Sequence, residues 1–278
     1  MKLSALFLIG LSMSGFSYFK SANNPQASSR DKNISTASIK TETVTYTVDG
    51  VTCQGYVAYD AAIKGKRPVV LVVPEWWGFT DYVKKRARQL AELGYLAMAV
   101  DMYGDGKVAA TPDEAGKLAG PFYKDPQMAK RHIDGALAKI KEYKEANVNK
   151  VAAIGYCFGG GVLLNTVRLG EDIQGVVSFH GNLIGVPANK DLLKAKILIC
   201  HGEADKFVKP EDVALFKHQM DSINADYTFK SYPNATHAFT NPDATALGKK
   251  FSMPIEYNEA ADKASWQDMQ VFLKKLFN

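Results

Sequence analysis

A short apolar run that ends in a glycine-rich turn constrains this chain more than any other stretch. Residues 151–161 read Val-Ala-Ala-Ile-Gly-Tyr-Cys-Phe-Gly-Gly-Gly, and a second apolar run, 162–167, follows directly. The first run predicts a buried strand and the second a helix, with Cys157 at the sharp turn between them. Gly155 and Gly159 provide space where strand and helix crowd together. Such a turn presents one thiol beside a helix N-terminus, whose dipole favours a thiolate and can bind an oxyanion.

Composition and charge limit the function classes. The 278 residues are 46% hydrophobic, which is enough to bury one large α/β core, and the formal net charge is +5. Basic and acidic residues alternate along the expected helices, so nucleic-acid binding is not indicated. Cys53, Cys157 and Cys200 are an odd number of cysteines at wide spacing. We therefore expect no disulfide framework, no metal and no cofactor, and we expect Cys53 and Cys200 to pack within strands.

The N-terminal region differs from the rest of the chain. Residues 1–28 begin with Lys2 and an apolar run, 3–11, that is too short and interrupted for a confident membrane span, so they predict a signal peptide. A clear cleavage site is lacking, and retention as a membrane anchor is the alternative. Residues 29–41, rich in Ser, Asn and Lys, predict a flexible linker. We expect an exported, periplasmic protein, or one anchored to the membrane by an uncleaved leader.

Strand and helix patterns alternate through residues 42–278. A β-hairpin around Asp49-Gly50 comes first, and the following alternation predicts a doubly wound, mostly parallel sheet. In such sheets ligands bind at the carboxyl ends of the strands, which is where Glu75 and Asp101 fall. The expected strands are 69–73, 95–100, 151–156, 175–179, 197–200 and 227–232, and the expected helices are 81–93, 111–123, 126–146, 210–222 and a last one through Trp266 and Leu276.

A nucleophilic cysteine needs a base to take its proton and a carboxylate to orient that base. Downstream of Cys157, an acidic stretch with Glu203 and Asp205 follows one buried strand, and His237 follows the last strand. This chain order of nucleophile, acid and histidine is that of the α/β-hydrolases. We expect His237 to be the base and Asp205 the acid, because that acid usually lies several residues past its strand; Glu203 is the alternative.

Taken together, these motifs resemble the dienelactone hydrolase family, also called carboxymethylenebutenolidase-like α/β-hydrolases, from about residue 42 to the C-terminus. The matching pieces are Pro74-Glu75-Trp76-Trp77-Gly78, Asp101-Met102-Tyr103, Gly155-Tyr156-Cys157-Phe158-Gly159-Gly160, Gly202-Glu203-Ala204-Asp205 and His237-Ala238-Phe239.

The resemblance implies an α/β-hydrolase fold and a thioester mechanism. Cys157 would be the nucleophile, and the backbone N–H groups of Trp76 and Phe158 would form the oxyanion hole. Glu75 would contact the thiol in the resting enzyme and help to deprotonate it when substrate arrives. The alternative for Glu75 is a structural carboxylate paired with a loop amide or an arginine.

Dienelactone-hydrolysing members bind the substrate carboxylate with two arginines, and this chain has Gly104 and Asn241 at those positions. A buried carboxylate without cationic partners is costly, so a dienelactone is not the expected natural substrate. Lys107 could compensate only if its loop folded inward. An apolar or aromatic pocket is expected instead. The residues predicted to line it are Trp76, Trp77, Tyr103, Phe158, His180 and Phe239.

The sequence thus predicts a cysteine hydrolase of small carboxylic esters or lactones, with a monomer favoured and no stable membrane association unless the leader is retained. Two other functions fit the same fold: a non-catalytic extracytoplasmic ligand-binding protein, and an acyltransferase.

Overall fold

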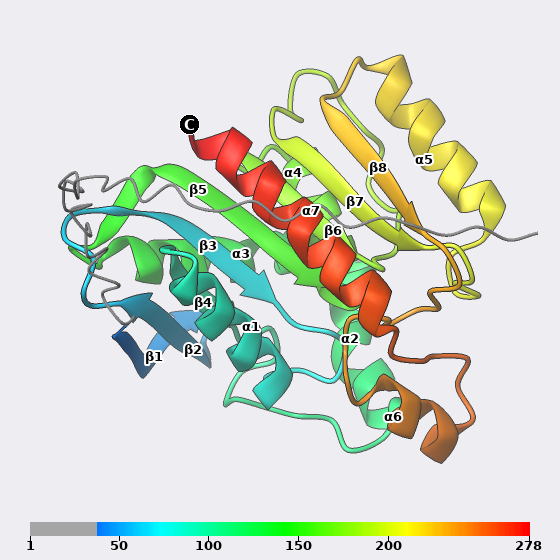
Figure 1. Cartoon of the computed structure of the whole chain (residues 1–278), viewed down its shortest axis with the longest axis horizontal. Helices are drawn as coiled ribbons and strands as arrows, with labels where there is room; N and C mark the ends of the chain where they lie inside the picture. The colour runs from blue at the N-terminus through cyan, green and yellow to red at the C-terminus, as the bar shows by residue number, and fades with distance from the viewer. Residues whose placement is uncertain (1–37) are drawn as a thin grey trace, which may run out of the picture. The chain divides into compact units, whose positions relative to one another are not determined.

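The computed structural model describes residues 38–278, and the predicted leader 1–28 lies outside them. These residues form an eight-stranded sheet in the order β1-β2-β4-β3-β5-β6-β7-β8 (Figure 1). Strands β3 to β8 run parallel, β4 included, whereas β2 is antiparallel to both β1 and β4. The strands are β1 (Ile39–Val48), β2 (Val51–Asp60), β3 (Arg67–Val73), β4 (Leu96–Val100), β5 (Ala146–Tyr156), β6 (Gly175–Phe179), β7 (Lys196–Gly202) and β8 (Tyr227–Tyr232).

Helices cover both faces of this sheet, as the doubly wound pattern predicts. One hydrophobic core lies under α1 and α7 and a second under α3, α4 and α5; Figure 1 shows α7 crossing the sheet on the near side with α3 behind it. The central strand β3 is apolar on both faces and almost fully buried, as expected for a parallel strand between two helical layers. The helices are α1 (Asp81–Glu92), α2 (Pro112–Lys124), α3 (Pro126–Lys141), α4 (Phe158–Arg168), α5 (Pro210–Ser222), α6 (Ala244–Phe251) and α7 (Glu259–Phe277).

The hairpin at the edge of the sheet is longer than predicted. Asp49 and Gly50 both have positive φ angles, 50° and 79°, the geometry of a tight two-residue hairpin turn. From that turn the two strands pair in unbroken register until Ile39 lies opposite Asp60. Residues 39–41 therefore belong to β1 and not to the linker 29–41, because their backbone completes the ladder with β2.

One helix is shorter than predicted, the strand after it begins earlier, at Ala146, and one helix was not predicted at all. The helix expected over 126–146 ends at Lys141, because Ala146 already pairs with Arg67 as the first residue of β5. Helix α6 was not predicted, since its eight residues are too few to show a clear period.

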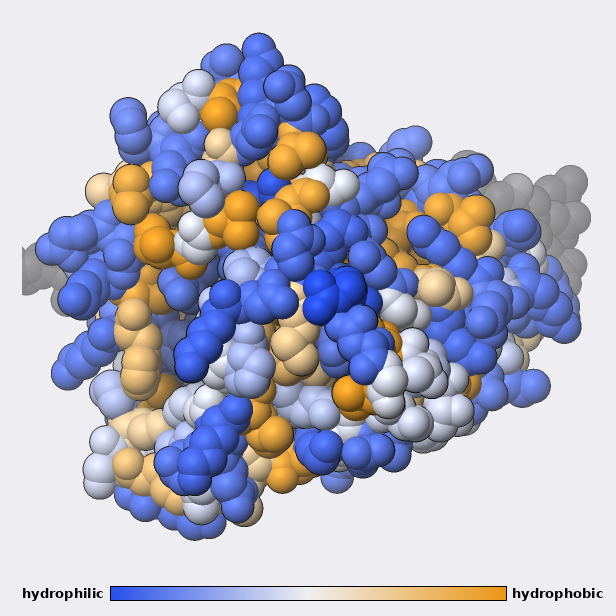
Figure 2. All heavy atoms as spheres, turned by 180° about the vertical axis from the view of Figure 1, so that it is seen from behind, coloured by the Kyte–Doolittle hydropathy of each residue, from blue (hydrophilic) through white to orange (hydrophobic). Residues whose placement is uncertain are grey.

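Figure 2 shows the side of the molecule opposite to α7, where hydrophilic residues cover most of the surface and apolar residues are interspersed among them. This is the solvated surface that the mixed charge pattern predicts. None of the helices in the described part of the chain is both long and apolar enough to cross a membrane.

Candidate active site

The turn between β5 and α4 holds the candidate nucleophile in an uncommon backbone conformation. Cys157 has φ 51° and ψ −113°, a region that non-glycine residues rarely occupy. The two glycines that flank it allow the strand and helix to meet. A Cβ on Gly155 would lie 2.4 Å from the carbonyl oxygen of Gly159, and one on Gly159 would lie 2.5 Å from that of Val73. This strained turn therefore presents a half-buried thiol at the carboxyl edge of the sheet.

Three side chains from separate strand ends meet at this thiol. His237, in the loop after β8, has its Nε2 3.0 Å from Cys157 Sγ, and its Nδ1 is 2.8 Å from Asp205 Oδ2. The other oxygen of Asp205 accepts hydrogen bonds from the backbone N–H groups of Phe207 (2.8 Å) and Val208 (3.3 Å). The structure thus brings together the three predicted residues, whereas Glu203, the alternative acid, is exposed.

The electrostatics of these three side chains fit an ion pair. Burial lowers the pKa of His237, but the charge of Cys157 and the hydrogen bonds and charge of Asp205 and Cys157 outweigh it and raise this pKa to about 10. Burial would raise the pKa of Asp205; the hydrogen bond and charge of His237 and the two amide N–H groups more than offset this, so the pKa is lowered. The raised pKa favours a protonated imidazole, which lies between the Asp205 carboxylate and the Cys157 sulfur.

Two backbone N–H groups, those of Trp76 and Phe158, are the candidates for the predicted oxyanion hole. Phe158 is the first residue of α4, so its N–H has no partner within the helix. Trp76 lies in the loop after β3. The backbone N–H of Gly159 donates to Pro74 O at 3.0 Å, and this hydrogen bond holds the start of α4 against that loop. Within residues 38–278 neither the Trp76 nor the Phe158 N–H donates to a protein acceptor. Both are therefore available to a ligand at the thiol.

Glu75 is buried at the same site as Cys157, but its hydrogen-bond partner is not the predicted thiol. Its Oε2 accepts from Asn241 Nδ2 at 2.6 Å, while the partner of Cys157 Sγ is His237. The expected contact between Glu75 and the thiol is thus replaced by the pairing with a loop amide, because Asn241 faces the carboxylate. Burial raises the pKa of Glu75 to about 7, against the opposing effects of the Asn241 hydrogen bond and the positive charges of His237 and Arg86.

A cavity of about 230 Å³ opens at the thiol, and its walls are mainly apolar. Its lining residues are Glu75, Trp76, Trp77, Tyr123, Cys157, Phe158, Asn182, Phe207, Val208, His237, Ala238, Met253 and Ile255.

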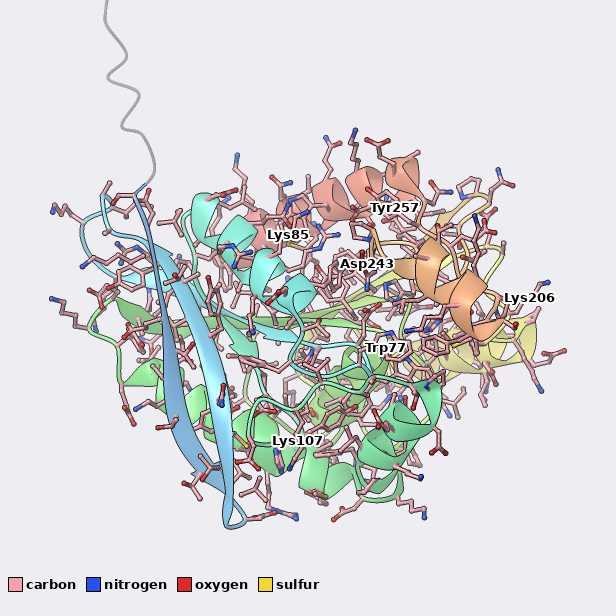
Figure 3. All side chains as sticks on the ribbon, turned by 90° about the horizontal axis from the view of Figure 1, so that it is seen from below. Trp77, Lys85, Lys107, Lys206, Asp243 and Tyr257 are labelled. Atoms are coloured by element: carbon pink, nitrogen blue, oxygen red, sulfur yellow. The ribbon has the colours of Figure 1, made fainter. Side chains whose placement is uncertain are left out.

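Of the six residues predicted to line the pocket, Trp76, Trp77 and Phe158 do so. Trp77 lies between α2 and α6 (Figure 3) and stacks on Phe251 with ring centroids 5.9 Å apart. Tyr103, His180 and Phe239 lie behind the wall, because each is buried in protein contacts. Tyr103 donates its hydroxyl to the carbonyl oxygen of Trp76 at 3.0 Å, and His180 packs edge-on against Phe239.

Sequence reasoning missed four of the larger lining side chains. Phe207 stands two residues past the triad acid, so its position offered a signal, and Tyr123 ends a predicted helix. Met253 and Ile255 follow α6, which was itself unpredicted, and they carried no signal.

Among the lining residues, none is a lysine or an arginine. The Lys107 side chain pairs with Asp105 on the surface at 3.2 Å and does not reach the cavity. Gly104 faces β2, where a Cβ would lie 2.2 Å from Val51 Cγ1. Lys206 points outward at the edge of the molecule, away from Trp77 (Figure 3). Among residues 38–278, no three His, Cys, Asp or Glu side chains are arranged to hold a metal ion.

A mostly parallel sheet with a cysteine at a strand–helix turn, followed in chain order by an acid and a histidine, defines an α/β-hydrolase. The family model of the dienelactone hydrolase family matches residues 53–277. The chain belongs to this family and is an ester or lactone hydrolase.

Individual proteins and solved structures are similar to most of the chain. Protein usf of Aquifex pyrophilus is 30% identical over 203 residues, which are 71% of this chain and 86% of that protein. A dienelactone hydrolase-like promiscuous phosphotriesterase from metagenomic libraries superposes with a TM-score of 0.81 at 32% identity, over 87% of this chain and all of the other. The structure of the protein m3DLH superposes with a TM-score of 0.82 at 30% identity, over 86% of this chain and 99% of its own.

Proposed function

We propose that this protein is a cysteine hydrolase that cleaves carboxylic esters or lactones through a thioester on Cys157. The observation that carries the proposal is the continuous chain from sulfur to imidazole to carboxylate, with separations of 3.0 Å and 2.8 Å, at the wall of an apolar cavity. A nucleophile within reach of a base that a third group orients is the arrangement that covalent catalysis requires.

In the acylation half, the Cys157 thiolate attacks the ester carbonyl carbon and the carbonyl oxygen becomes an oxyanion. The N–H groups of Trp76 and Phe158 would donate to that oxyanion. When the tetrahedral intermediate collapses, the C–O bond to the alcohol breaks, and the alkoxide takes the Nε2 proton of the His237 imidazolium. The products are a free alcohol, a thioester on Cys157 and a neutral His237.

The deacylation half needs a basic His237, and the thioester itself supplies this condition. The charge of Cys157 is the largest influence that raises the pKa of His237. A thioester sulfur carries no charge, so acylation removes that influence and lowers the pKa. Neutral His237 can then take a proton from water as the water attacks the thioester. Collapse of the second intermediate releases the acid and restores the thiolate and the imidazolium.

The cavity favours a neutral, apolar acyl group. Its lining includes the aromatic side chains of Trp76, Trp77, Tyr123, Phe158 and Phe207, and it contains no lysine or arginine that could pair with a carboxylate. A buried anionic substituent would lose its hydration without gaining a partner. We therefore assign aliphatic or aromatic esters and lactones without an acidic substituent as the substrate class.

Mass spectrometry of the protein mixed with an activated ester such as p-nitrophenyl butyrate tests the mechanism. We expect one butyryl adduct, located on the peptide with Cys157, and a burst of p-nitrophenol. The Cys157→Ala variant should give neither. An adduct elsewhere, or wild-type turnover by this variant, would contradict the proposal, and ligand-induced stabilisation without turnover would favour a binding protein.

We also propose that the protein is exported and acts outside the cytoplasm. The support is the sequence of residues 1–28, with Lys2 followed by the apolar run 3–11. N-terminal sequencing of the protein recovered from a periplasmic fraction should begin after residue 11, whereas an intact N-terminus in a membrane fraction would indicate an anchor.

A further inference from the structure

A buried histidine outside the triad contacts both the turn that holds Cys157 and the loop that holds His237. His180 follows β6 and is only 1% exposed. Its Nδ1 accepts a hydrogen bond from the backbone N–H of Cys157 at 3.1 Å. Its Nε2 lies 2.7 Å from Oγ1 of Thr240, which stands three residues past His237 in the same loop. One imidazole ring therefore spans the distance between the nucleophile turn and the loop of the base.

The partners of this ring fix its proton. A backbone N–H can only donate, so Nδ1 of His180 must carry a lone pair. The proton of the neutral ring then lies on Nε2 and is donated to Thr240 Oγ1. Burial lowers the pKa of His180 well below its usual range, and the positive charges of His237 and Arg86 lower it further, so the ring stays neutral.

The far end of the bridge is anchored in two helices. Thr240 Oγ1 is also 2.7 Å from the hydroxyl of Tyr82 in α1, and Arg86 donates to that hydroxyl at 3.3 Å. Arg86 also donates to the carbonyl oxygen of Thr240 at 2.9 Å and forms an ion pair with Asp262 in α7. The loop of the base is thus held to the helical layer that covers one face of the sheet.

The near end of the bridge meets strained backbone. Cys157 has φ 51° and His180 has φ 41°, both in the left-handed region that non-glycine residues seldom occupy. Such conformations persist only where surrounding contacts hold them. The N–H of Cys157 also faces the carbonyl oxygen of Phe179 at 2.9 Å, so His180 supplements a backbone bond at this turn.

We propose that His180 is a positioning residue that couples the nucleophile turn to the loop of the base and so fixes the separation of Cys157 Sγ and His237 Nε2. The inference rests on the proposed function. His180 does not line the cavity, so its effect is on the geometry of the pair and not on substrate contact. A displacement of reacting groups by a fraction of an ångström lowers turnover while leaving ground-state binding nearly intact.

Two amide substitutions separate the two hydrogen bonds of the ring. In His180→Asn the side-chain oxygen can occupy the place of Nδ1, which preserves the acceptor for Cys157 and removes the bond to Thr240. In His180→Gln the amide reaches the place of Nε2, which preserves the contact with Thr240 and removes the acceptor for Cys157. We expect each variant to lower kcat roughly 10- to 100-fold with KM within about threefold of wild type.

A pH profile separates positioning from general destabilisation. Cys157 raises the pKa of His237, so a greater distance between Cys157 Sγ and His237 Nε2 should lower that pKa. The alkaline limb of the kcat/KM profile should therefore move to lower pH in both His180 variants. The matched control is Thr166→Val, which removes another fully buried threonine hydroxyl, bonded to Val162 O in α4. This control should keep the wild-type kcat and alkaline limb even where it lowers the unfolding midpoint.

A double-mutant cycle completes the test. Thr240→Val and His180→Asn remove the same hydrogen bond, so their effects on kcat should be less than additive. Wild-type kcat and alkaline limbs in both His180 variants would overturn the proposal, as would equal losses in Thr166→Val. Failure of the proposed function is distinguishable, because Cys157→Ala would then retain activity and no acyl adduct would form in wild-type protein.

Discussion

Residues 38–278 contain two hydrogen-bonded cysteine–histidine pairs, and their sulfur and imidazole groups differ in charge and accessibility. In the candidate active site, Sγ of half-buried Cys157 is 3.0 Å from Nε2 of His237, whose other nitrogen bonds Asp205. Under the hairpin, Sγ of Cys53 is 3.8 Å from Nδ1 of His132, with both residues almost fully buried. Among residues 38–278, Nε2 of His132 has no hydrogen-bond partner.

The difference shows that adjacency of sulfur and imidazole does not make a nucleophile. Burial, with the nearby charge of Asp101, raises the pKa of Cys53 to about 12, and burial lowers the pKa of His132. Both groups are therefore neutral at physiological pH. A carboxylate on the far nitrogen, as Asp205 provides for His237, is what stabilises an imidazolium and with it a thiolate.

The largest contrast should appear in turnover after removal of each sulfur. Cys157→Ala should lower kcat/KM for p-nitrophenyl butyrate by roughly 10³-fold or more, because the covalent route is lost. Cys53→Ala should stay within about twofold of wild type and change only stability, since Cys53 packs in β2 away from the cavity. A comparable loss in both variants would mean that the two pairs are not functionally distinct.

Replacing Asp205 tests whether its carboxylate is what distinguishes the Cys157–His237 pair from the Cys53–His132 pair. Asp205→Asn presents an amide N–H to His237 Nδ1, which forces the imidazole proton onto the side of the sulfur, and kcat should fall roughly 10²- to 10⁴-fold. Asn can still accept from the N–H of Phe207, so folding should be retained. Glu203→Gln, at the exposed alternative acid, is the matched control and should leave kcat near wild type; a large loss there would reassign the acid.

Chemical labelling should distinguish the sulfurs without mutation. Only Cys157 is accessible, while Cys53 and Cys200 are fully buried. Iodoacetamide should therefore alkylate one cysteine in native protein and three in denaturant, with peptide mass spectrometry assigning the native site to Cys157. Native labelling of Cys53 at a similar rate would show that the hairpin opens readily.

Glu75 sharpens the comparison, because burial acts on this carboxyl as it does on Cys53. Its pKa of about 7 lies above that of an unfolded glutamate, so the folded state holds a proton that the unfolded state has lost. The resulting loss of stability grows as pH rises from about 4.5 to 7 and amounts to roughly 3 kcal/mol. Glu75→Gln removes the titration and can still accept from Asn241. Urea unfolding at pH 5 and pH 8 should show the variant gaining relative to wild type at pH 8, and parallel curves would contradict the raised pKa.

Local sequence patterns predicted the elements and the reactive residues better than they predicted the cavity. Helix α5 and strand β8 have the bounds that their periodicity indicated, and Cys157 and His237 meet because their strands run parallel. The hydrogen bond from Asn241 to Glu75 joins residues far apart in the chain and left no local signal. Tyr103 and Phe239 have the composition of pocket residues, but packing decides which side of a wall an aromatic ring occupies.

The smallest effect expected is on the pH dependence of the free energy of unfolding. His132 and His237 should change that free energy in opposite directions as the pH rises. An unfolded histidine binds a proton near pH 6.5, whereas buried His132 does so only at lower pH. Its contribution to folding stability is therefore complete above pH 6.5 and is lost on acidification. The raised pKa of His237 has the reverse effect: its contribution is complete below pH 6.5 and is lost as pH rises through about 10. His132→Leu removes the first titration and the unpartnered Nε2. Urea unfolding should show the variant gaining stability relative to wild type as the pH falls from 7 to 5. An equal difference at both pH values would mean that folding does not lower the pKa of His132, and the two pairs would then differ less than their surroundings indicate.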